Sequence, residues 1–342
     1  MDISDSNVID NNENIHILEV KNLHTSFFTE NGEVKAVDGV DFAIDKGKTL
    51  GIVGESGSGK SITSLSIMRL LRGTTGKIKE GEIWFRGEDL LKKSERQMSR
   101  VRGHDISMVF QEPMTSLNPT MTCGEQIAEA VRTHRNLNNK DAWESAVRML
   151  ARVGMPEPEK RAKQYPFELS GGMRQRVMIA MALSCHPDLL IADEPTTALD
   201  VTIQAQILDL IKRLQQEYGT AMVMITHDLG VIAEVCDHVA VMYCGKIVEY
   251  TSAYTLFTDP KHPYTIGLLK SIPSHEKDSD DDLDIIQGTV PSPYDLPKGC
   301  AFAPRCPHAK DLCKETMPDL TEFVPGRKVR CYLHQANVEG WE

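Results

Sequence analysis

TLGIVGESGSGKS, residues 49–61, joins a short strand to a glycine-rich loop and decides the fold. The run 49–53 is almost wholly apolar, as in strands that are buried on both faces of a parallel sheet. The loop fits G-x-x-x-x-G-K-S/T, and a helix is expected from about Lys60 to Leu71. The loop's N–H groups and the start of its helix attract anions, so the stretch predicts a phosphate site. The residues expected to bind phosphate are Gly54, Glu55, Ser56, Gly57, Ser58, Gly59, Lys60 and Ser61.

Alternating strands and helices follow this loop and indicate an α/β fold with a mostly parallel core sheet. Residues 16–50 instead alternate between apolar and polar side chains, which predicts an antiparallel β region. Residues 122–163 have a mostly helical pattern. Further strands are expected at 82–85, 106–110, 189–192 and 221–226, and helices over 142–153 and 202–217.

Length and charge limit the classes of protein that fit. The 342 residues suggest about two domains. The net charge is −11, but the excess acid lies mainly in residues 1–15 and 274–284, so a strongly basic nucleic-acid-binding protein is disfavoured. Residues 1–15 lack the basic and apolar regions of a secretory signal and are expected to be a disordered acidic tail. No apolar run approaches the roughly 20 residues that span a bilayer, so a cytosolic protein is expected.

Two acids end the apolar strand in DLLIADE, residues 188–194. Asp193, with Ser61, is expected to bind Mg²⁺, and Glu194 to polarise the water that attacks a phosphate. Such a pair alone is a weak signal, since acids often cap the helix after a strand. Gln111 and His227 also come directly after predicted strands, so four strand ends are expected to meet at one edge of the sheet.

LSGGMRQR, residues 169–176, is a second glycine-containing helix start and cannot belong to the first phosphate loop. It resembles the signature motif of the ATP-binding subunits of ABC transporters, and it precedes DLLIADEP and TTALD as in that family. The resemblance covers residues 16–258. It implies an ABC-type nucleotide-binding domain with a RecA-like parallel-sheet core, an antiparallel β subdomain and a helical subdomain at about 112–168.

The same resemblance implies roles for individual residues. Gln111 is the expected Q-loop residue, acting in catalysis and at Mg²⁺, and His227 is expected to sense the γ-phosphate. Asp200 is the expected D-loop aspartate, and Phe27, or its neighbour Phe28, is the ring expected to stack on adenine. The signature residues are Leu169, Ser170, Gly171, Gly172, Met173, Arg174 and Gln175, and in this family they close over ATP held by a second subunit.

One chain would therefore form half of each ATP site. The sequence holds no internal repeat, so a second ATPase chain, identical or homologous, is expected as a partner. Residues 112–120 are expected to dock on a membrane permease, because family members use this region to do so, although their prolines and polar residues also suit a plain loop.

KHPYT, residues 261–265, resembles the start of the C-terminal extension of oligopeptide and dipeptide transporter ATPases. The extension is expected to cover residues 259–342, with an acidic linker at 274–284. Its stretch GCAFAPRCPHAKDLC continues the resemblance and belongs to a pattern Cys-x5-Cys-x6-Cys-x17-Cys. Four thiolates suit an iron–sulfur cluster or Zn²⁺, and unliganded thiols stay open as a third possibility. The resemblance implies a 4Fe-4S cluster on Cys300, Cys306, Cys313 and Cys331.

These features predict a peptide-importer ATPase that uses ATP and Mg²⁺ at the cytoplasmic face of the membrane. Its expected partners are a second ATPase, two permeases and, indirectly, an extracytoplasmic peptide-binding protein. The alternative is a soluble ABC-type ATPase with a redox or iron–sulfur regulatory role, which permease partners would exclude. A P-loop kinase is disfavoured because it does not need LSGGMRQR. The sequence does not indicate the substrate, since related systems move dipeptides, oligopeptides, nickel or sugars.

Overall fold

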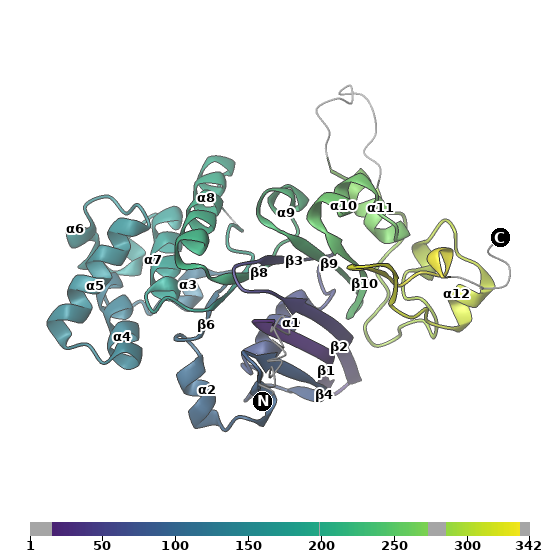
Figure 1. Cartoon of the computed structure of the whole chain (residues 1–342), viewed down its shortest axis with the longest axis horizontal. Coiled ribbons are helices and arrows are strands. Elements are labelled where there is room, and N and C mark those ends of the chain that lie inside the picture. The colour runs from purple at the N-terminus through teal and green to yellow at the C-terminus, as the bar shows by residue number, and fades with distance from the viewer. Residues whose placement is uncertain (1–15, 198, 273–284, 336–342) are drawn as a thin grey trace, which may run out of the picture.

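The computed structural model describes residues 16–197, 199–272 and 285–335. The predicted acidic tail at 1–15 and the whole predicted linker at 274–284 therefore lie outside the described residues. Two sheets organise the described part of the chain, one with eight strands and one with four. Figure 1 shows the helices of the predicted helical subdomain at one end of the molecule and the C-terminal extension at the other.

The eight-stranded sheet has the order β11-β12-β10-β9-β3-β8-β7-β6. Its pairs from β6 through β7, β8 and β3 to β9 are all parallel, so the prediction of a mostly parallel core is confirmed. The parallel strands are β3 (Thr49–Val53), β6 (Ile106–Val109), β7 (Leu189–Asp193), β8 (Ala221–Ile225) and β9 (His238–Tyr243). Every residue of β3, β6, β7 and β8 is buried, which explains their apolar sequences.

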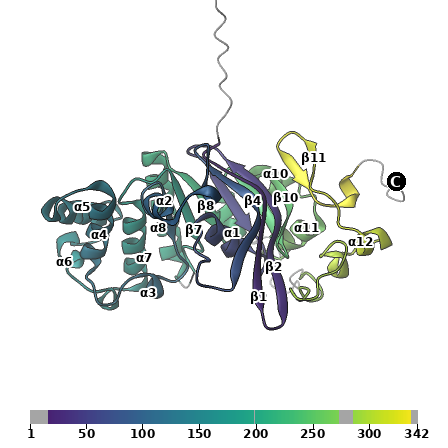
Figure 2. The same cartoon turned by 90° about the horizontal axis from the view of Figure 1, so that it is seen from below.

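The four-stranded sheet is antiparallel, as residues 16–50 predicted, and has the order β2-β1-β4-β5. It packs against the large sheet through one shared apolar core, to which Leu18 of β1, Ile52 of β3 and Ile67 of α1 all belong (Figure 2). Its strands are β1 (Leu18–Thr29), β2 (Gly32–Ile44), β4 (Gly76–Phe85) and β5 (Glu88–Asp89).

The phosphate-loop helix α1 (Lys60–Ile67) ends four residues before the expected Leu71. Arg69 has φ 51°, a left-handed conformation that cannot continue a right-handed helix. The strand predicted at 106–110 likewise ends one residue early, at Val109. Prediction places the centre of an element better than its ends, because local turns decide where it stops.

Most of residues 113–183 are helical. The segment between β6 and β7 holds α3 (Pro113–Ser116), α4 (Cys123–Arg135), α5 (Asn139–Arg152), α6 (Pro158–Ala162) and α7 (Gly171–Leu183). Asn138 caps α5 by accepting a hydrogen bond from the backbone N–H of Asp141 at 2.9 Å. Helices α8 (Val201–Tyr218) and α9 (Leu229–Val235) then connect the last parallel strands. Within the part of the chain that the structure describes, no helix is long and apolar enough to cross a membrane.

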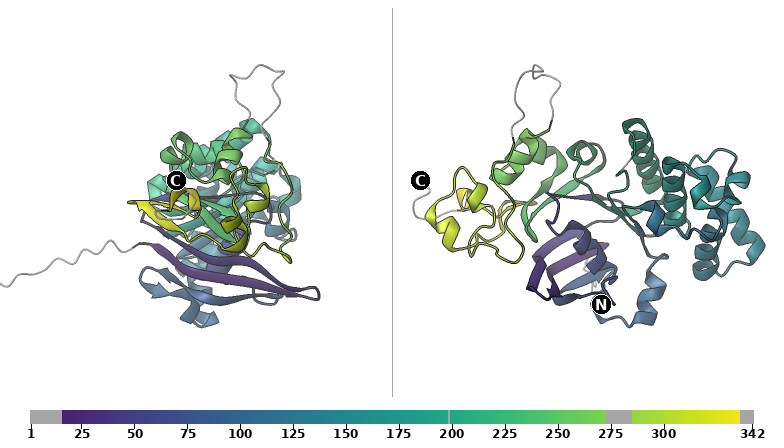
Figure 3. Two further views of the ribbon diagram at one scale, coloured as in Figure 1. Left: turned by 90° about the vertical axis from the view of Figure 1, so that its right-hand side faces the viewer. Right: turned by 180° about the vertical axis from the view of Figure 1, so that it is seen from behind.

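The extension adds two strands to the edge of the large sheet, which the sequence did not indicate. Strand β12 (Arg327–Val329) pairs with β10 (Lys246–Ser252), and β11 (Thr321–Val324) pairs with β12. The remaining elements of this region are α10 (Ala253–Thr258), α11 (Pro263–Lys270) and α12 (Asp311–Glu315). Figure 3 shows the extension beside β10 and α11 in two further views.

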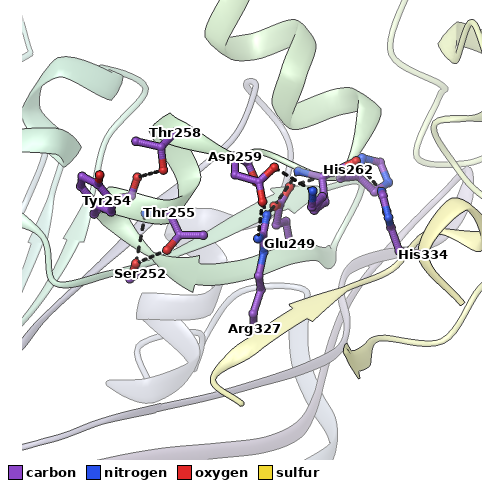
Figure 4. Close-up of polar contacts among 10 residues, drawn as sticks. Glu249, Ser252, Tyr254, Thr255, Thr258, Asp259, His262, Arg327 and His334 are labelled. Carbon is purple, nitrogen blue, oxygen red and sulfur yellow. Dashed lines mark hydrogen bonds and ion pairs between the residues drawn. The ribbon is translucent and has the colours of Figure 1, made fainter. Parts of the chain in front are cut away.

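A buried carboxylate joins the extension to the core. Glu249 of β10 is fully buried and accepts hydrogen bonds from the backbone N–H groups of Lys261 at 2.9 Å and His262 at 2.8 Å (Figure 4). Arg327 of β12 lies 3.7 Å from the same carboxylate and donates to Asp259 at 2.9 Å. Polar contacts therefore cross the expected domain boundary near Asp259, and the extension packs on the core as part of one folded unit.

Candidate functional site

The phosphate loop, residues 54–61, runs from β3 into α1 and depends on two glycines with positive φ. A Cβ atom at Gly54 (φ 153°) would lie 2.2 Å from the carbonyl oxygen of Met242. A Cβ at Gly59 (φ 102°) would lie 2.3 Å from the carbonyl oxygen of Ala36. No side chain fits at either position, because the clashing atoms are backbone. The neighbouring β2 and β9 therefore hold the loop in a shape that exposes its N–H groups.

Lys60 lies at the start of α1 with its ammonium group turned back into the loop. Its Nζ donates to the carbonyl oxygens of Gly54 at 2.8 Å and Glu55 at 3.0 Å. Burial lowers the pKa of Lys60, although the nearby carboxylates oppose that shift. The ammonium is thus held by two neutral oxygens at a place where the phosphates of a nucleotide would supply a stronger, anionic partner.

Ser61 and Asp193 bring a hydroxyl and a carboxylate together beside the loop. The Ser61 hydroxyl donates to Asp193 Oδ1 at 3.0 Å, although 132 positions separate the two residues. Asp193 ends β7 and is only 6% exposed, and burial raises its pKa. A bound divalent cation would favour the ionised carboxylate, and oxygen donors of these two kinds suit Mg²⁺.

Glu194 is the centre of a polar cluster at the carboxyl ends of the parallel strands. Its carboxylate accepts a hydrogen bond from Gln111 Nε2 at 2.9 Å and lies 3.4 Å from His227 Nδ1. Glu194 has φ 46°, and its N–H donates to Ile225 of the neighbouring β8 at 2.8 Å. This left-handed residue directs the carboxylate away from the strand. The sequence-predicted residues after β6, β7 and β8 therefore meet in space.

Thr197 belongs to the same cluster and was missed by the sequence analysis. Its hydroxyl donates to Glu194 Oε2 at 2.8 Å, so that this oxygen has two donors. The available signal was its position three residues after the acid, where a threonine can reach back to a side chain at the start of a turn.

A pocket of about 930 Å³ connects the loop to the Glu194 cluster and to the β1–β2 hairpin. This volume is within the range of ligand pockets, about 300–1,000 Å³. Phe27 lines the pocket, whereas Phe28 is not among its lining residues and lies under the ammonium of Lys77. Phe27 is therefore the better placed of the two candidate adenine-stacking rings, and that role stays a prediction.

The signature residues lie elsewhere on the molecule. Ser170 caps α7 by accepting a hydrogen bond from the N–H of Met173, and Asp200 caps α8 by accepting one from Ile203 at 3.0 Å. Both line a second pocket, of about 540 Å³, that shares no lining residue with the first. Leu169 and Gln175 are buried, and the Gln175 amide donates to the carbonyl oxygen of Pro195. Within one chain, the signature therefore does not contribute to the pocket of the phosphate loop.

Four cysteines of the extension line one small pocket, the cysteine pocket, together with His262 and His308. Burial raises the pKa of Cys300, Cys306 and Cys331, in the last case to about 12. The four residues of the predicted ligand set, Cys300, Cys306, Cys313 and Cys331, are thus gathered at one place. Among the described residues, however, no group of three or more Cys, His, Asp or Glu side chains is arranged to hold a metal ion.

Comparison with known families gives two matches along this chain. A family model described as "ABC transporter" matches residues 37–197. A second, described as "Oligopeptide/dipeptide transporter, C-terminal region", matches residues 248–313. The first match contains the phosphate loop, Gln111, the signature and Glu194, and the second contains three of the four cysteines that line the cysteine pocket.

Curated relatives match over nearly the whole chain. The oligopeptide transport ATP-binding protein AppD of Bacillus subtilis is 55% identical over 319 residues, which cover 93% of this chain and 97% of AppD. The oligopeptide transport ATP-binding protein OppD of Salmonella typhimurium is 52% identical, with 92% and 93% covered. The dipeptide transport ATP-binding protein DppD of Bacillus subtilis is 50% identical, with 94% and 96% covered.

Solved structures confirm the predicted fold class. The ATP-binding cassette MJ0796, in a dimeric post-hydrolysis state bound to ADP and Pi, superposes with a TM-score of 0.63 at 27% sequence identity. The match covers 69% of this chain and 98% of that one. A similar value, 0.61, is found for cbiO1 from Clostridium perfringens, part of the ABC transporter complex cbiONQ, at 26% identity with 71% and 91% covered.

Proposed function

This chain belongs to the family of oligopeptide and dipeptide transport ATP-binding proteins, and we propose that it hydrolyses ATP to energise the import of peptides through a membrane ABC transporter. The observation that carries this function is the meeting of Glu194, Gln111 and His227 beside the phosphate loop. That arrangement offers an anion site and a water-activating carboxylate in one pocket, as phosphoryl transfer requires.

The residues of the pocket have separate tasks in this proposal. The loop N–H groups and Lys60 bind the β- and γ-phosphates, and Ser61, Asp193 and Gln111 are the residues that would hold Mg²⁺. When bound, Mg²⁺ neutralises charge that develops on the phosphate oxygens. Glu194 orients and polarises the attacking water, for which its position at the end of β7 and its two hydrogen-bond donors are suited. 

His227 completes the proposed site as the residue that senses the γ-phosphate. Its side chain is 67% exposed and lies at the rim of the pocket, where it can contact both Glu194 and a bound phosphate. Phe27 stacks on the adenine at the other end of the pocket. The chain's own residues thus account for phosphate, metal, water and base.

Two chains are needed for hydrolysis in this proposal. Signature residues 170–173 and Asp200 line a pocket separate from the phosphate loop, so they are available to close over the ATP of a partner. The partner is a second ATPase, identical or homologous. Binding of two ATP molecules closes the pair, and hydrolysis lets it open, which is how a chemical step is converted into movement.

The movement is passed to two membrane permeases in this proposal, and an extracytoplasmic peptide-binding protein delivers the substrate to them. The permeases dock near residues 112–120, where Met114 of α3 is 48% exposed. The chain accordingly works at the cytoplasmic face of the membrane. In this proposal the other subunits contact the transported substrate, and they decide whether dipeptides or oligopeptides are moved.

Purification of the tagged chain from gently solubilised host membranes tests this function. Mass spectrometry should identify two permeases and an ATPase in stoichiometric amounts, and the purified assembly should hydrolyse ATP faster when the loaded peptide-binding protein is added. Recovery from the soluble fraction alone, without permeases, would contradict the transport function and favour the alternative of a soluble regulatory ATPase.

We further propose that the cysteine pocket holds a 4Fe-4S cluster, in preference to Zn²⁺. The support is the donor set, four cysteines from a segment with little apolar core of its own, which bound metal would stabilise. Such a cluster would cross-link the four cysteines of the extension. Its bound thiolates would replace the protonated thiols that burial favours.

Anaerobically purified protein should be brown and contain about four iron atoms and four sulfides per chain. Colourless, iron-free protein would exclude the cluster, and bound zinc would favour the alternative metal.

A further inference from the structure

A segment of the extension, residues 290–296, forms part of the wall of the nucleotide pocket. We propose that this segment, named the strap here, binds the purine base and ribose of ATP from the side opposite Phe27. The inference rests on the proposed function, since it assumes that ATP occupies the pocket. It adds a nucleotide-binding element that begins 47 positions after the end of β9, the last parallel strand of the core.

The strap contributes five residues to the pocket lining, and four of them are apolar. Val290 is 41% exposed, unusually open for a valine that borders a pocket. The β1–β2 hairpin contributes further apolar residues to the same lining, among them Phe27, Val34 and Ala36. The strap residues in the lining are Val290, Pro291, Ser292, Pro293 and Leu296.

Contacts at both ends hold the strap across the pocket. Before the strap, the Arg305 guanidinium donates to the carbonyl oxygens of Ile286 at 3.3 Å and Gln287 at 3.2 Å, and the same group binds Glu55 of the phosphate loop. Within the strap, the hydroxyl of Tyr294 lies 3.1 Å from that of Thr29 at the end of β1. The strap thus extends from the phosphate loop to the strand that carries Phe27.

The backbone of the strap is stiff for a segment without helix or strand. Pro291 and Pro293 each fix φ near −65°, and Ser292 accepts hydrogen bonds from the N–H groups of Tyr294 at 3.3 Å and Asp295 at 3.0 Å. A wall that is already ordered loses little entropy when a ligand binds, so its contacts add to affinity.

The chemistry of the wall fits a base better than a phosphate. The strap residues that line the pocket carry no charge, and their only polar side chain is a hydroxyl. A purine has apolar faces and a polar edge, so it suits an apolar slot bordered by one hydroxyl, with the ring of Phe27 on the other side. The phosphate end of the pocket is supplied separately by the phosphate loop.

A double variant of the full chain, Val290→Ala with Leu296→Ala, tests the proposal. Binding is measured for two probes, the imido analogue of ATP and inorganic tripolyphosphate, which has the phosphates but no base. Loss of apolar contacts should weaken binding of the ATP analogue by about tenfold and leave tripolyphosphate binding unchanged. The control is Val324→Ala, at a valine of β11 that is 46% exposed but does not line the pocket.

The possible results separate the two proposals. Unchanged affinity for the ATP analogue would overturn the role of the strap while leaving the ATP site intact. Equal weakening for both probes would show that the strap acts through the phosphate loop, which also overturns a contact with the base. Failure of the unaltered chain to bind either probe would instead contradict the proposed function.

Photolabelling gives a second test that does not require a variant to fold. ATP with an azido group on the purine is bound to the unaltered chain and irradiated, and the labelled peptides are identified by mass spectrometry. We expect label on the strap and on the peptide that contains Phe27, with excess ATP suppressing both. Label on the β1 peptide alone would place the base away from the strap and overturn the proposal.

Discussion

Arg305 of the extension binds Glu55 of the phosphate loop through two hydrogen bonds, from Nη1 to Oε2 at 2.7 Å and from Nη2 to Oε1 at 3.1 Å. The Arg305 side chain is 5% exposed, and the pair raises the pKa of its guanidinium. Tyr264 of α11 binds the same loop residue, since its hydroxyl accepts a hydrogen bond from the Glu55 N–H at 2.8 Å. The extension therefore fixes the first turn of the loop through both the side chain and the backbone of Glu55.

Replacement of Arg305 by alanine should loosen the phosphate loop. A two-point hydrogen bond between charged groups is lost, and because Glu55 is partly exposed we expect a cost of only about 1–2 kcal/mol in stability. The KM for ATP should rise by roughly threefold to tenfold, since the loop must then be ordered by the ligand itself. ATPase assays of the assembled complex and thermal denaturation of the purified chain measure the two effects.

Arg305→Lys and Arg100→Ala are the matched variants for this prediction. Lysine keeps the charge but cannot form the two-point contact, so it should restore only part of the ATP affinity. Arg100 is exposed on α2 (Glu95–Val101), and its replacement should change neither KM nor the denaturation temperature. An Arg305→Ala protein with unaltered KM would show that the loop keeps its shape without the contact between Arg305 and Glu55.

The contact between Arg305 and Glu55 also marks the limit of sequence-based prediction here. Residues 49–53 and the loop could be located because an apolar run and a glycine pattern are local signals. The meeting of Gln111, Glu194 and His227 followed from a general rule, that parallel strands bring their carboxyl ends to one edge. No such rule connects positions 250 apart in the chain, so the Arg305–Glu55 contact had no sequence signal.

Short or irregular elements were missed for related reasons. The β9–β10 hairpin turns at Cys244 and Gly245, both with positive φ, and a cysteine is not a typical residue for such a turn. Strands β11 and β12 are too short to show an alternating pattern. The strap has no periodicity at all, and its place in the pocket depends on tertiary contacts alone.

Replacement of Glu194 by glutamine should preserve ATP binding and stop turnover. The amide has the same shape, so the contacts with Gln111 and Thr197 change little, but it cannot polarise water as a carboxylate does. Loss of a general base lowers rates by about 10²–10⁴-fold. The phosphate-release rate and the ATP dissociation constant are measured together, with the exposed Glu234→Gln as control. Normal hydrolysis by Glu194→Gln would assign the base to another residue.

Replacement of Ser170 by arginine should separate binding from hydrolysis in a different way. Ser170 does not line the phosphate-loop pocket, so the chain should bind ATP with its usual affinity. A long cationic side chain at the start of α7 would obstruct closure over the partner's ATP, and the assembled complex should lose about 100-fold in turnover. Ser99→Arg, on the exposed surface of α2, is the control. Weakened ATP binding by the isolated Ser170→Arg chain would contradict the separation of the two pockets.

Two thiols, Cys244, which is partly buried, and Cys123, which is buried, provide a test of nucleotide occupancy. Burial raises the pKa of both Cys244 and Cys123 to about 11, so at pH 8 roughly one thiol in a thousand is ionised. Alkylation of Cys244 should therefore accelerate about tenfold per pH unit between pH 8 and pH 10.

Because Cys244 lines the nucleotide pocket, ATP should slow its alkylation. The alkylation rate of Cys123 in α4 should not change when ATP is added. Peptide mass spectrometry after timed alkylation measures both rates, and equal protection of the two thiols would indicate a general tightening of the fold.

Replacement of Glu249 by alanine should separate the extension from the core. The change leaves the backbone N–H groups of Lys261 and His262 without their acceptor and removes the carboxylate beside Arg327. Each unpaired buried donor costs about 1–3 kcal/mol, so a loss of about 2–6 kcal/mol is expected for the two donors together. Glu315→Ala, at an exposed position in α12, should have almost no effect on the denaturation temperature.

Limited proteolysis shows which part of the Glu249→Ala chain is destabilised. Cleavage should begin in the extension while residues 16–197 stay protected. Uniform cleavage along the chain would instead mean that the extension and the core unfold together, and an unchanged denaturation temperature would show that β10 and β12 remain joined without this carboxylate.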